Sequence, residues 1–217
     1  YQLIRTLGQG NYGQVYLVKD IMSNQKVTFP LKKIARSYDL KRDKWVEREI
    51  QICLLLNHPN IIHIKTYFKD EEYYYLIFEY IEGNSLATLL KKKKLKSKQI
   101  NLYLFQLLDA ITYCHYHSIV HRDLKIENIM ITNTSQLKVI DFGLSNYFNI
   151  TQKLTTYCGT VPYISPEIVK ANCYVGPEVD IWSIGVILYA MCTRTLPFGN
   201  PSVEKNYYAI VTGQVNY

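Results

Sequence analysis

The segment VHRDLKIENIMI, residues 120–131, gathers acidic, basic and amide side chains within a stretch that is otherwise apolar. Asp123 is placed to accept a proton or a hydrogen bond from an attacking hydroxyl group. Asn128 offers a neutral oxygen ligand for a hard cation such as Mg²⁺, and Lys125 can neutralise charge on a phosphoryl group during transfer. These residue types suit phosphoryl transfer.

A second acidic residue follows this segment, in VIDFGLSN. Asp141 would add an anionic metal ligand, and Gly143 permits a sharp turn shortly after it.

Three glycines lie between two strand-like runs near the N-terminus, in LGQGNYGQVYLV. Gly8, Gly10 and Gly13 have no Cβ, so their backbone N–H groups can approach phosphate oxygens closely. An ordinary glycine turn in a hairpin is the alternative interpretation. A dinucleotide-binding fold needs a helix after the third glycine, whereas QVYLV favours a strand, so the pattern points away from a Rossmann site.

Two adjacent lysines follow in FPLKKI, at the end of a predicted strand. Neighbouring strand residues point to opposite faces, so only one of Lys32 and Lys33 can serve a phosphate site. The expected carboxylate partner is Glu49 in VEREI, with Glu47 as the competing choice. A surface ion pair of little energetic value is the alternative for either.

The apolar pattern divides the chain into two parts. Residues 1–80 are rich in β-branched and aromatic residues, which predicts a small sheet, with one helix from about Asp43 to Leu56. Residues 81–217 change to a helical period, with helices expected up to about Tyr116 and from Ile181 to Met191. The apolar stripes expected on the helices are formed by Val46, Ile50, Cys53 and Leu54, and by Leu102, Phe105, Leu107, Leu108 and Ile111.

Composition narrows the class of protein. The 217 residues are 48% apolar and can bury a core, and much of the +7 charge lies in KKKKLKSK at residues 91–98, which is interpreted as a solvated helix end and loop. Five scattered cysteines without a C-x-x-C pair predict neither a zinc site nor a disulfide framework, and favour an intracellular, cytoplasmic protein. No signal peptide, transmembrane segment or nucleic-acid partner is predicted.

In this order, the motifs GQGNYGQV, HRDLKIEN, DFG, SPE and DIWSIGVILY resemble the eukaryotic protein kinase family over essentially all 217 residues. The resemblance implies an α+β, two-lobed fold, with a small antiparallel sheet and one main helix in the N-lobe and a mainly helical C-lobe. It also implies that Glu167 pairs with an arginine beyond residue 217, where the last helices of the C-lobe would lie.

The resemblance implies that ATP is the phosphate donor and Mg²⁺ the cofactor. Asp123 would be the catalytic base, Lys125 would stand near the γ-phosphate, and Asn128 and Asp141 would hold Mg²⁺. Lys32 would contact the α- and β-phosphates and be oriented by Glu49. The expected ATP-binding residues, with Phe78 as gatekeeper, are Gly8, Gly10, Gly13, Val15, Pro30, Lys32, Phe78, Glu79, Ile81 and Met130.

Finer features are similar to the serine/threonine branch, and within it to the calcium/calmodulin-dependent and AMP-activated kinase group. Lys125 and Thr160, in CGTVPY, carry the serine/threonine likeness, which implies protein substrates with Ser/Thr acceptors. Thr156, in LTTYCGT, is expected to be phosphorylated by an upstream activating kinase, and Arg122 would pair with that phosphate.

One departure from the family pattern concerns the strand that carries the two lysines. Pro30 lacks the N–H group of an interior strand residue, so a bulge or a change in which lysine points inward is expected there. The alternatives are a catalytically silent pseudokinase that acts as a scaffold, and a small-molecule phosphotransferase of similar fold.

Overall fold

The computed structural model describes residues 1–10, 13–22, 27–37 and 40–215. The chain forms two compact units, Tyr1–Glu82 and Gly83–Tyr217, called unit 1 and unit 2 below. Their boundary lies two residues beyond the predicted end of the N-terminal lobe. Within the described residues, no helix has the length and apolar character that crossing a membrane would require.

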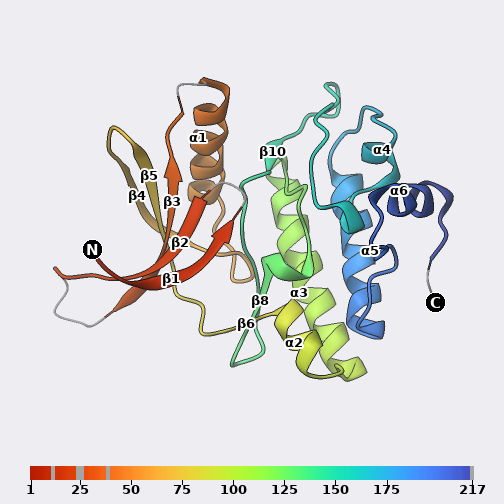
Figure 1. Cartoon of the computed structure of the whole chain (residues 1–217), viewed down its shortest axis with the longest axis horizontal. Coiled ribbons are helices and arrows are strands. Elements are labelled where there is room, and N and C mark those ends of the chain that lie inside the picture. The colour runs from red at the N-terminus through yellow and green to blue at the C-terminus, as the bar shows by residue number, and fades with distance from the viewer. Residues whose placement is uncertain (11–12, 23–26, 38–39, 216–217) are drawn as a thin grey trace. The chain divides into compact units, whose positions relative to one another are not determined.

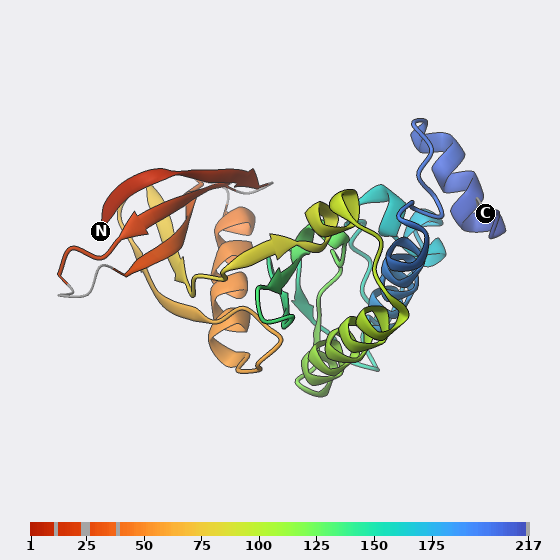
Figure 2. The same cartoon turned by 90° about the horizontal axis from the view of Figure 1, so that it is seen from below.

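Unit 1 is a five-stranded antiparallel sheet with one helix (Figure 1). The strands stand in the order β1-β2-β3-β5-β4, so β3 is the central one. Figure 2 shows the helix, in orange, lying against one face of this sheet. The elements are β1 (Gln2–Gly10), β2 (Gly13–Lys19), β3 (Thr28–Ala35), α1 (Leu40–Leu55), β4 (Ile64–Lys69) and β5 (Tyr73–Phe78).

The strand β3 keeps its register through Pro30. The β2–β3 ladder runs without a shift from Gln14 opposite Lys33 to Lys19 opposite Thr28, and Pro30 stands opposite Leu17. The β3–β5 ladder begins one residue later, at Leu31, so Pro30 has no ladder partner on β5. The expected bulge at Pro30 is therefore wrong, because the proline lies where the central strand is paired on one side only.

Cross-strand register places the predicted ATP-binding residues of the sheet on one face. Val15 stands opposite Lys32, and Lys32 stands opposite Leu76. Alternation along a strand puts Pro30 on the same face as Lys32 and puts Lys33 on the other. The other face carries a separate apolar cluster of Val18, Leu31 and Ile77 with Tyr16, Phe29 and Tyr75 packed against it.

The helix α1 buries a different face from the one that simple spacing suggests. Val46, Ile50 and Cys53 are buried as expected, but Leu54 is 54% exposed. The buried side chains continue instead through Ile52, because the face turned inward is centred near Glu49 and Leu54 lies past its edge.

Unit 2 is built around two long helices that pack against each other, α3 and α5 (Figure 1). Two small sheets, with strand orders β6-β8-β9 and β10-β7, flank the catalytic segment predicted from the sequence. The elements are β6 (Gly83–Ser85), α2 (Leu86–Lys92), α3 (Ser97–Tyr116), β7 (Ile119–Val120), η1 (Ile126–Asn128), β8 (Ile129–Thr132), β9 (Leu137–Val139), β10 (Asn146–Tyr147), η2 (Val161–Tyr163), α4 (Pro166–Val169), α5 (Pro177–Thr193) and α6 (Val203–Thr212).

The buried stripe of α3 differs in part from the predicted one. Leu107 and Ile111 are buried, whereas Leu102, Phe105 and Leu108 are 39–70% exposed. The inward face consists of Tyr103, Leu107, Ala110, Ile111 and Cys114. This spacing of four, three, one and three residues is helical, but the stripe includes the small residues alanine and cysteine, which a search for large apolar residues passes over.

The lysine-rich tract of residues 91–98 is exposed to solvent, and the cysteines differ in their exposure. All six lysines of residues 91–98 are exposed, and Leu95 alone among these residues is buried. None of the five cysteines, all of which lie in the described residues, forms a disulfide bond. Cys53 and Cys114 are buried, Cys158 is half-buried, and Cys173 and Cys192 are exposed.

Candidate active site

In unit 1, a buried ion pair links the central strand to the helix. Lys32 Nζ lies 2.6 Å from Glu49 Oε1, and the two residues are 8% and 3% exposed. The competing acid Glu47 lies outside this pair, with its carboxylate 3.9 Å from Lys69 Nζ and in contact with the Tyr74 hydroxyl at 3.4 Å. Burial removes the hydration of both the ammonium and the carboxylate group, so each charge is stabilised only by its buried partner.

The two adjacent lysines have separate environments, as their opposite positions on the strand require. Lys33 directs its ammonium group over the ring of Tyr73, 3.6 Å from the ring centroid. This cation–π contact lies on the face opposite to Glu49. Of the two lysines, Lys32 is therefore the one that the structure brings to Glu49.

The glycines of the β1–β2 hairpin are needed for different reasons. A Cβ atom on Gly13 would clash with the backbone carbonyl of Lys33, so close packing on β3 demands a glycine there. A Cβ atom on Gly8 would meet no atom of the described structure within 4 Å, so its backbone is open to an approaching ligand. Gly10 stands opposite Gly13, and residues 11 and 12 lie outside the described residues.

The residues expected to contact adenine are divided between the units. In unit 1, Val15 and Pro30 are half-buried, as is Ile81, and Phe78 is 8% exposed. Met130 belongs to unit 2, where it lies in β8 between Ser85 of β6 and Lys138 of β9. The segment after Phe78 is held by two bonds between Glu79 and His63: the Glu79 N–H donates to the His63 carbonyl, and the His63 N–H donates to the Glu79 carboxylate, each at 2.9 Å.

In unit 2, three side chains converge on the carboxylate of Asp123. Thr160 donates its hydroxyl to Asp123 Oδ1 at 2.7 Å. Lys125 Nζ donates to Asp123 Oδ2 at 2.8 Å and to Thr160 Oγ1 at 2.9 Å. Asn128 Nδ2 donates to the carbonyl of Asp123 at 3.0 Å and to Oδ2 at 3.2 Å. Asp123 is 5% exposed, so its charge is balanced by an ammonium group and two further donors.

Apolar anchors hold this segment in place. Ile119 and Val120 before it, and Ile129 after it, are fully buried, and so is Leu124 within it. Burial of these side chains fixes the intervening backbone, so the charged side chains of the segment are positioned before any ligand binds.

The two expected metal ligands lie at the same end of one small sheet. In the β8–β9 ladder Ile129 stands opposite Val139, and the Ile140 N–H donates to the Asn128 carbonyl at 2.9 Å. Asp141 follows directly, with a φ of 65°. The Asn128 amide nitrogen is used by Asp123, which leaves its oxygen for a cation, and an amide oxygen with a carboxylate is a donor set that fits Mg²⁺. In the described part of the chain, no group of three or more His, Cys, Asp or Glu side chains forms a metal site by itself.

Sequence reasoning missed the residue that anchors the catalytic segment to α5. Asp180 is fully buried and accepts the backbone N–H groups of His121 at 2.9 Å and Arg122 at 2.8 Å. Its Oδ2 also lies 2.9 Å from His115 Nε2. The signal in the sequence was an aspartate at the start of the most apolar helix, since a buried carboxylate must find donors elsewhere in the fold.

The structure does not join Thr156 to Arg122 directly. Thr156 is exposed, and Arg122, with a φ of 66°, is 5% exposed. Arg122 donates from Nε to the Leu144 carbonyl at 2.8 Å and from Nη1 to the Tyr174 hydroxyl at 3.3 Å. Tyr174 in turn donates to the Thr156 carbonyl at 2.8 Å, so it is a second residue that sequence reasoning missed.

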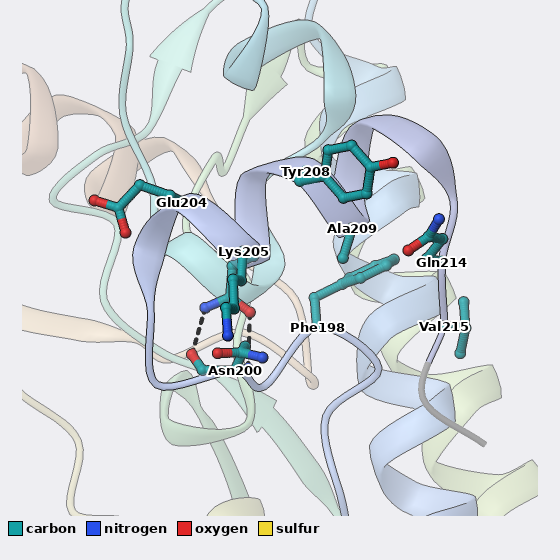
Figure 3. A pocket seen from close by; sticks show the side chains of 9 residues that line it. Phe198, Asn200, Glu204, Lys205, Tyr208, Ala209, Gln214 and Val215 are labelled. Atoms are coloured by element: carbon teal, nitrogen blue, oxygen red, sulfur yellow. Dashed lines mark hydrogen bonds between the residues drawn. The ribbon is translucent and has the colours of Figure 1, made fainter.

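A cavity of about 560 Å³ in unit 2 involves none of the predicted site residues (Figure 3). It is lined by α6 and the segments on either side, including Phe198, Tyr208 and Val215. Two hydrogen bonds between Asn200 and Asn206 close the turn that enters α6, at 2.6 and 2.8 Å. Asn200 and Asn206, which line the cavity, therefore stabilise the start of α6.

The family model described as "Protein kinase domain" matches residues 1–216. The chain is 41% identical over 205 residues to the "Probable serine/threonine-protein kinase KIN1 homolog" of Enterocytozoon bieneusi, covering 94% of this chain and 34% of that protein. It is 39% identical over 213 residues to the protein of the same name from Encephalitozoon cuniculi, covering 94% and 37%. It is 37% identical over 215 residues to the "Carbon catabolite-derepressing protein kinase" of Saccharomyces cerevisiae, covering 98% and 34%. The chain thus spans about a third of the length of these relatives.

Proposed function

The chain belongs to the protein kinase domain family, and on this premise we propose that it is the catalytic part of an ATP-dependent protein serine/threonine kinase. The observation that carries the proposal is the bond from the Thr160 hydroxyl to Asp123 Oδ1 at 2.7 Å. The Asp123 carboxylate already accepts a hydrogen bond from one threonine hydroxyl, so it can also accept one from the Ser or Thr hydroxyl of a substrate.

The residues of unit 2 would perform the transfer on the acceptor side. Asp123 accepts the hydrogen bond of a substrate Ser or Thr hydroxyl and orients its oxygen toward the γ-phosphorus. The oxygen–phosphorus bond forms, the bond from the γ-phosphorus to the β–γ bridging oxygen breaks, and the hydroxyl proton passes to Asp123. Lys125 keeps a positive charge beside Asp123, which offsets the negative charge of the phosphoryl group.

The residues of unit 1 would bind ATP through its phosphates. Lys32, oriented by Glu49, would contact the α- and β-phosphates, and the open backbone at Gly8 would cover them. Asn128 and Asp141 of unit 2 would hold Mg²⁺, which neutralises phosphate charge when bound. The remaining residues proposed to contact ATP are Gly10, Gly13, Val15, Pro30, Phe78, Glu79, Ile81 and Met130.

We further propose that an upstream kinase phosphorylates Thr156 and thereby raises activity. The Thr156 side chain is exposed and therefore accessible to another enzyme. A phosphate adds a charge of about −1.5 to −2 and can pair with an arginine, and Arg122 directly precedes Asp123. Its present partners are a carbonyl and a phenol, so an anion would be a stronger partner for the guanidinium.

The test is transfer of labelled phosphate from Mg²⁺-ATP to a mixed peptide library, followed by identification of the modified amino acids. Wild-type protein should transfer labelled phosphate to the Ser and Thr residues of the peptides. Asp123→Asn should lower the rate constant by about 10²- to 10⁴-fold, because the acceptor of the proton is lost. Asp141→Asn should abolish turnover while the protein stays folded. ATP binding to Asp123→Asn, measured separately, serves as the control for an intact nucleotide site.

Three outcomes would contradict the proposal. ATP binding without transfer to any acceptor would identify a scaffold, and transfer to small molecules but not to peptides would identify a small-molecule phosphotransferase. Near-normal transfer by Asp141→Asn would remove that residue from the metal site. For the regulatory part, full activity in protein that carries no phosphate on Thr156, verified by mass spectrometry, would exclude activation through this residue.

A further inference from the structure

The hydroxyl of Tyr174 connects two functional segments of unit 2. It receives a hydrogen bond from Arg122 Nη1 at 3.3 Å and donates one to the Thr156 carbonyl at 2.8 Å. The backbone of Tyr174 adds two bonds to Leu154, one in each direction, at 2.7 and 3.0 Å. The residue is 2% exposed, so these bonds are shielded from water.

The two residues that Tyr174 connects differ in how firmly they are held. Arg122 is held by Asp180 through its backbone N–H and by Leu144 through Nε, and it directly precedes Asp123. The side chain of Thr156 is exposed. Among the described residues, the hydrogen bond at its carbonyl is the only one that Thr156 makes. A change at the Tyr174 hydroxyl therefore acts on Arg122 and on the backbone at residue 156 together.

The chemistry of a phenol suits this position. A neutral hydroxyl group can accept from the guanidinium and donate to a carbonyl at the same time. Burial, with a contribution from Cys158, raises the pKa of Tyr174 to about 12, while the bond from Arg122 acts in the opposite direction. The hydroxyl therefore keeps its proton at neutral pH and can donate it to Thr156. Phenylalanine would fill nearly the same volume but satisfy neither neighbour.

We propose that Tyr174 is a positioning residue that ties the backbone at Thr156 to Arg122, and so holds the loop against the catalytic segment when Thr156 carries no phosphate. The inference rests on the proposed kinase function and adds a source of basal activity to it. Because the tie uses the carbonyl of residue 156, it is independent of the Thr156 side chain. Once a phosphate on Thr156 bonds Arg122 directly, the tie should matter less.

The test compares Tyr174→Phe with Tyr103→Phe, which removes a hydroxyl from an equally buried tyrosine on α3. In unphosphorylated protein, Tyr174→Phe should lower kcat for a peptide about three- to tenfold, the effect of losing one or two hydrogen bonds, with an unchanged KM for ATP. The same loss should appear in the Thr156→Ala background. Phosphorylation of Thr156 should restore most of the activity of Tyr174→Phe, whereas a purely structural defect would persist in both forms.

A second readout does not depend on activity. Amide hydrogen exchange in residues 151–160 should accelerate in Tyr174→Phe and stay at the wild-type rate in Tyr103→Phe. If the wild-type protein transfers no phosphate but exchange still accelerates in Tyr174→Phe, the kinase function is refuted and the tie stands. Unchanged kcat and exchange in an active Tyr174→Phe protein would overturn the tie and leave the kinase function standing. An equal loss of kcat in the two variants would also overturn it.

Discussion

Lys32 and Lys33 are neighbours in β3, but their ammonium groups lie in very different surroundings. Lys32 is buried against the Glu49 carboxylate, and Lys33 is half-buried over the ring of Tyr73. Loss of one partner of a buried ion pair costs about 3–5 kcal/mol, because the other charge stays buried without it, whereas a cation–π contact near the surface contributes about 0.5–1 kcal/mol. The two lysines should therefore respond differently to the same substitution.

We expect Lys32→Met to lower the free energy of unfolding of unit 1 by several times as much as Lys33→Met, and to abolish ATP turnover where Lys33→Met does not. Unit 1 and unit 2 each contain one of the two tryptophans, Trp45 and Trp182. Urea unfolding followed by fluorescence in a Trp182→Phe background reports on unit 1 alone.

A double variant separates the two effects of Lys32. Lys32→Met with Glu49→Leu removes both buried charges and should recover most of the lost stability without recovering turnover. Equal destabilisation by the two single lysine variants, or loss of turnover only in Lys33→Met, would show that the assignment of Lys32 is wrong.

At the scale of elements, the β1–β2 hairpin has one glycine that is required by packing and one that is not. A side chain at Gly13 would meet backbone of β3, which cannot move without disturbing the central strand, whereas Gly8 faces open space. We expect Gly13→Ala to lower the free energy of unfolding of unit 1 by about 1–3 kcal/mol. Gly8→Ala should be neutral or slightly stabilising, since alanine loses less conformational entropy on folding.

The same Trp45 fluorescence measurement tests this pair of variants. Gly8→Ala should instead raise the KM for ATP, if the open backbone there covers the phosphates. Equal stability of the two variants would contradict the packing argument, and an unchanged KM in Gly8→Ala would remove that glycine from the phosphate site.

Elements were easier to predict than the faces that they bury. A β-rich part followed by a helical part was visible from the apolar period alone. So were three helices, near residues 43–56, up to about residue 116, and at residues 181–191. The inward faces of α1 and α3 were partly wrong because Ile52 and Ala110 are buried there in place of Leu54 and Phe105. The expected bulge at Pro30 was also wrong, because sequence does not reveal where the β3–β5 ladder begins.

At the scale of the whole molecule, local segments were predictable and long-range contacts were not. The side chains of residues 120–131 cluster because they are close in sequence, so their types and spacing already indicated the chemistry. Asp180 is 58 residues from Arg122, and Tyr174 is 52 residues from it. No spacing rule joins such residues, because their contacts depend on how α3, α5 and the small sheets pack. Of these two residues, only Asp180 gave a signal in the sequence, as an acid at the start of an apolar helix.

The five cysteines differ in exposure, so spectroscopic labels can be attached selectively to the exposed ones. Cys173 and Cys192 are exposed and should react first with a maleimide, while Cys53 and Cys114 are buried, and burial raises the pKa of Cys114, which depletes its reactive thiolate. A single Cys192→Ser change would leave Cys173 as the exposed thiol, directly beside Tyr174. A nitroxide attached to Cys173 would report on the motion of the surroundings of Tyr174, with the buried thiols Cys53 and Cys114 left in place.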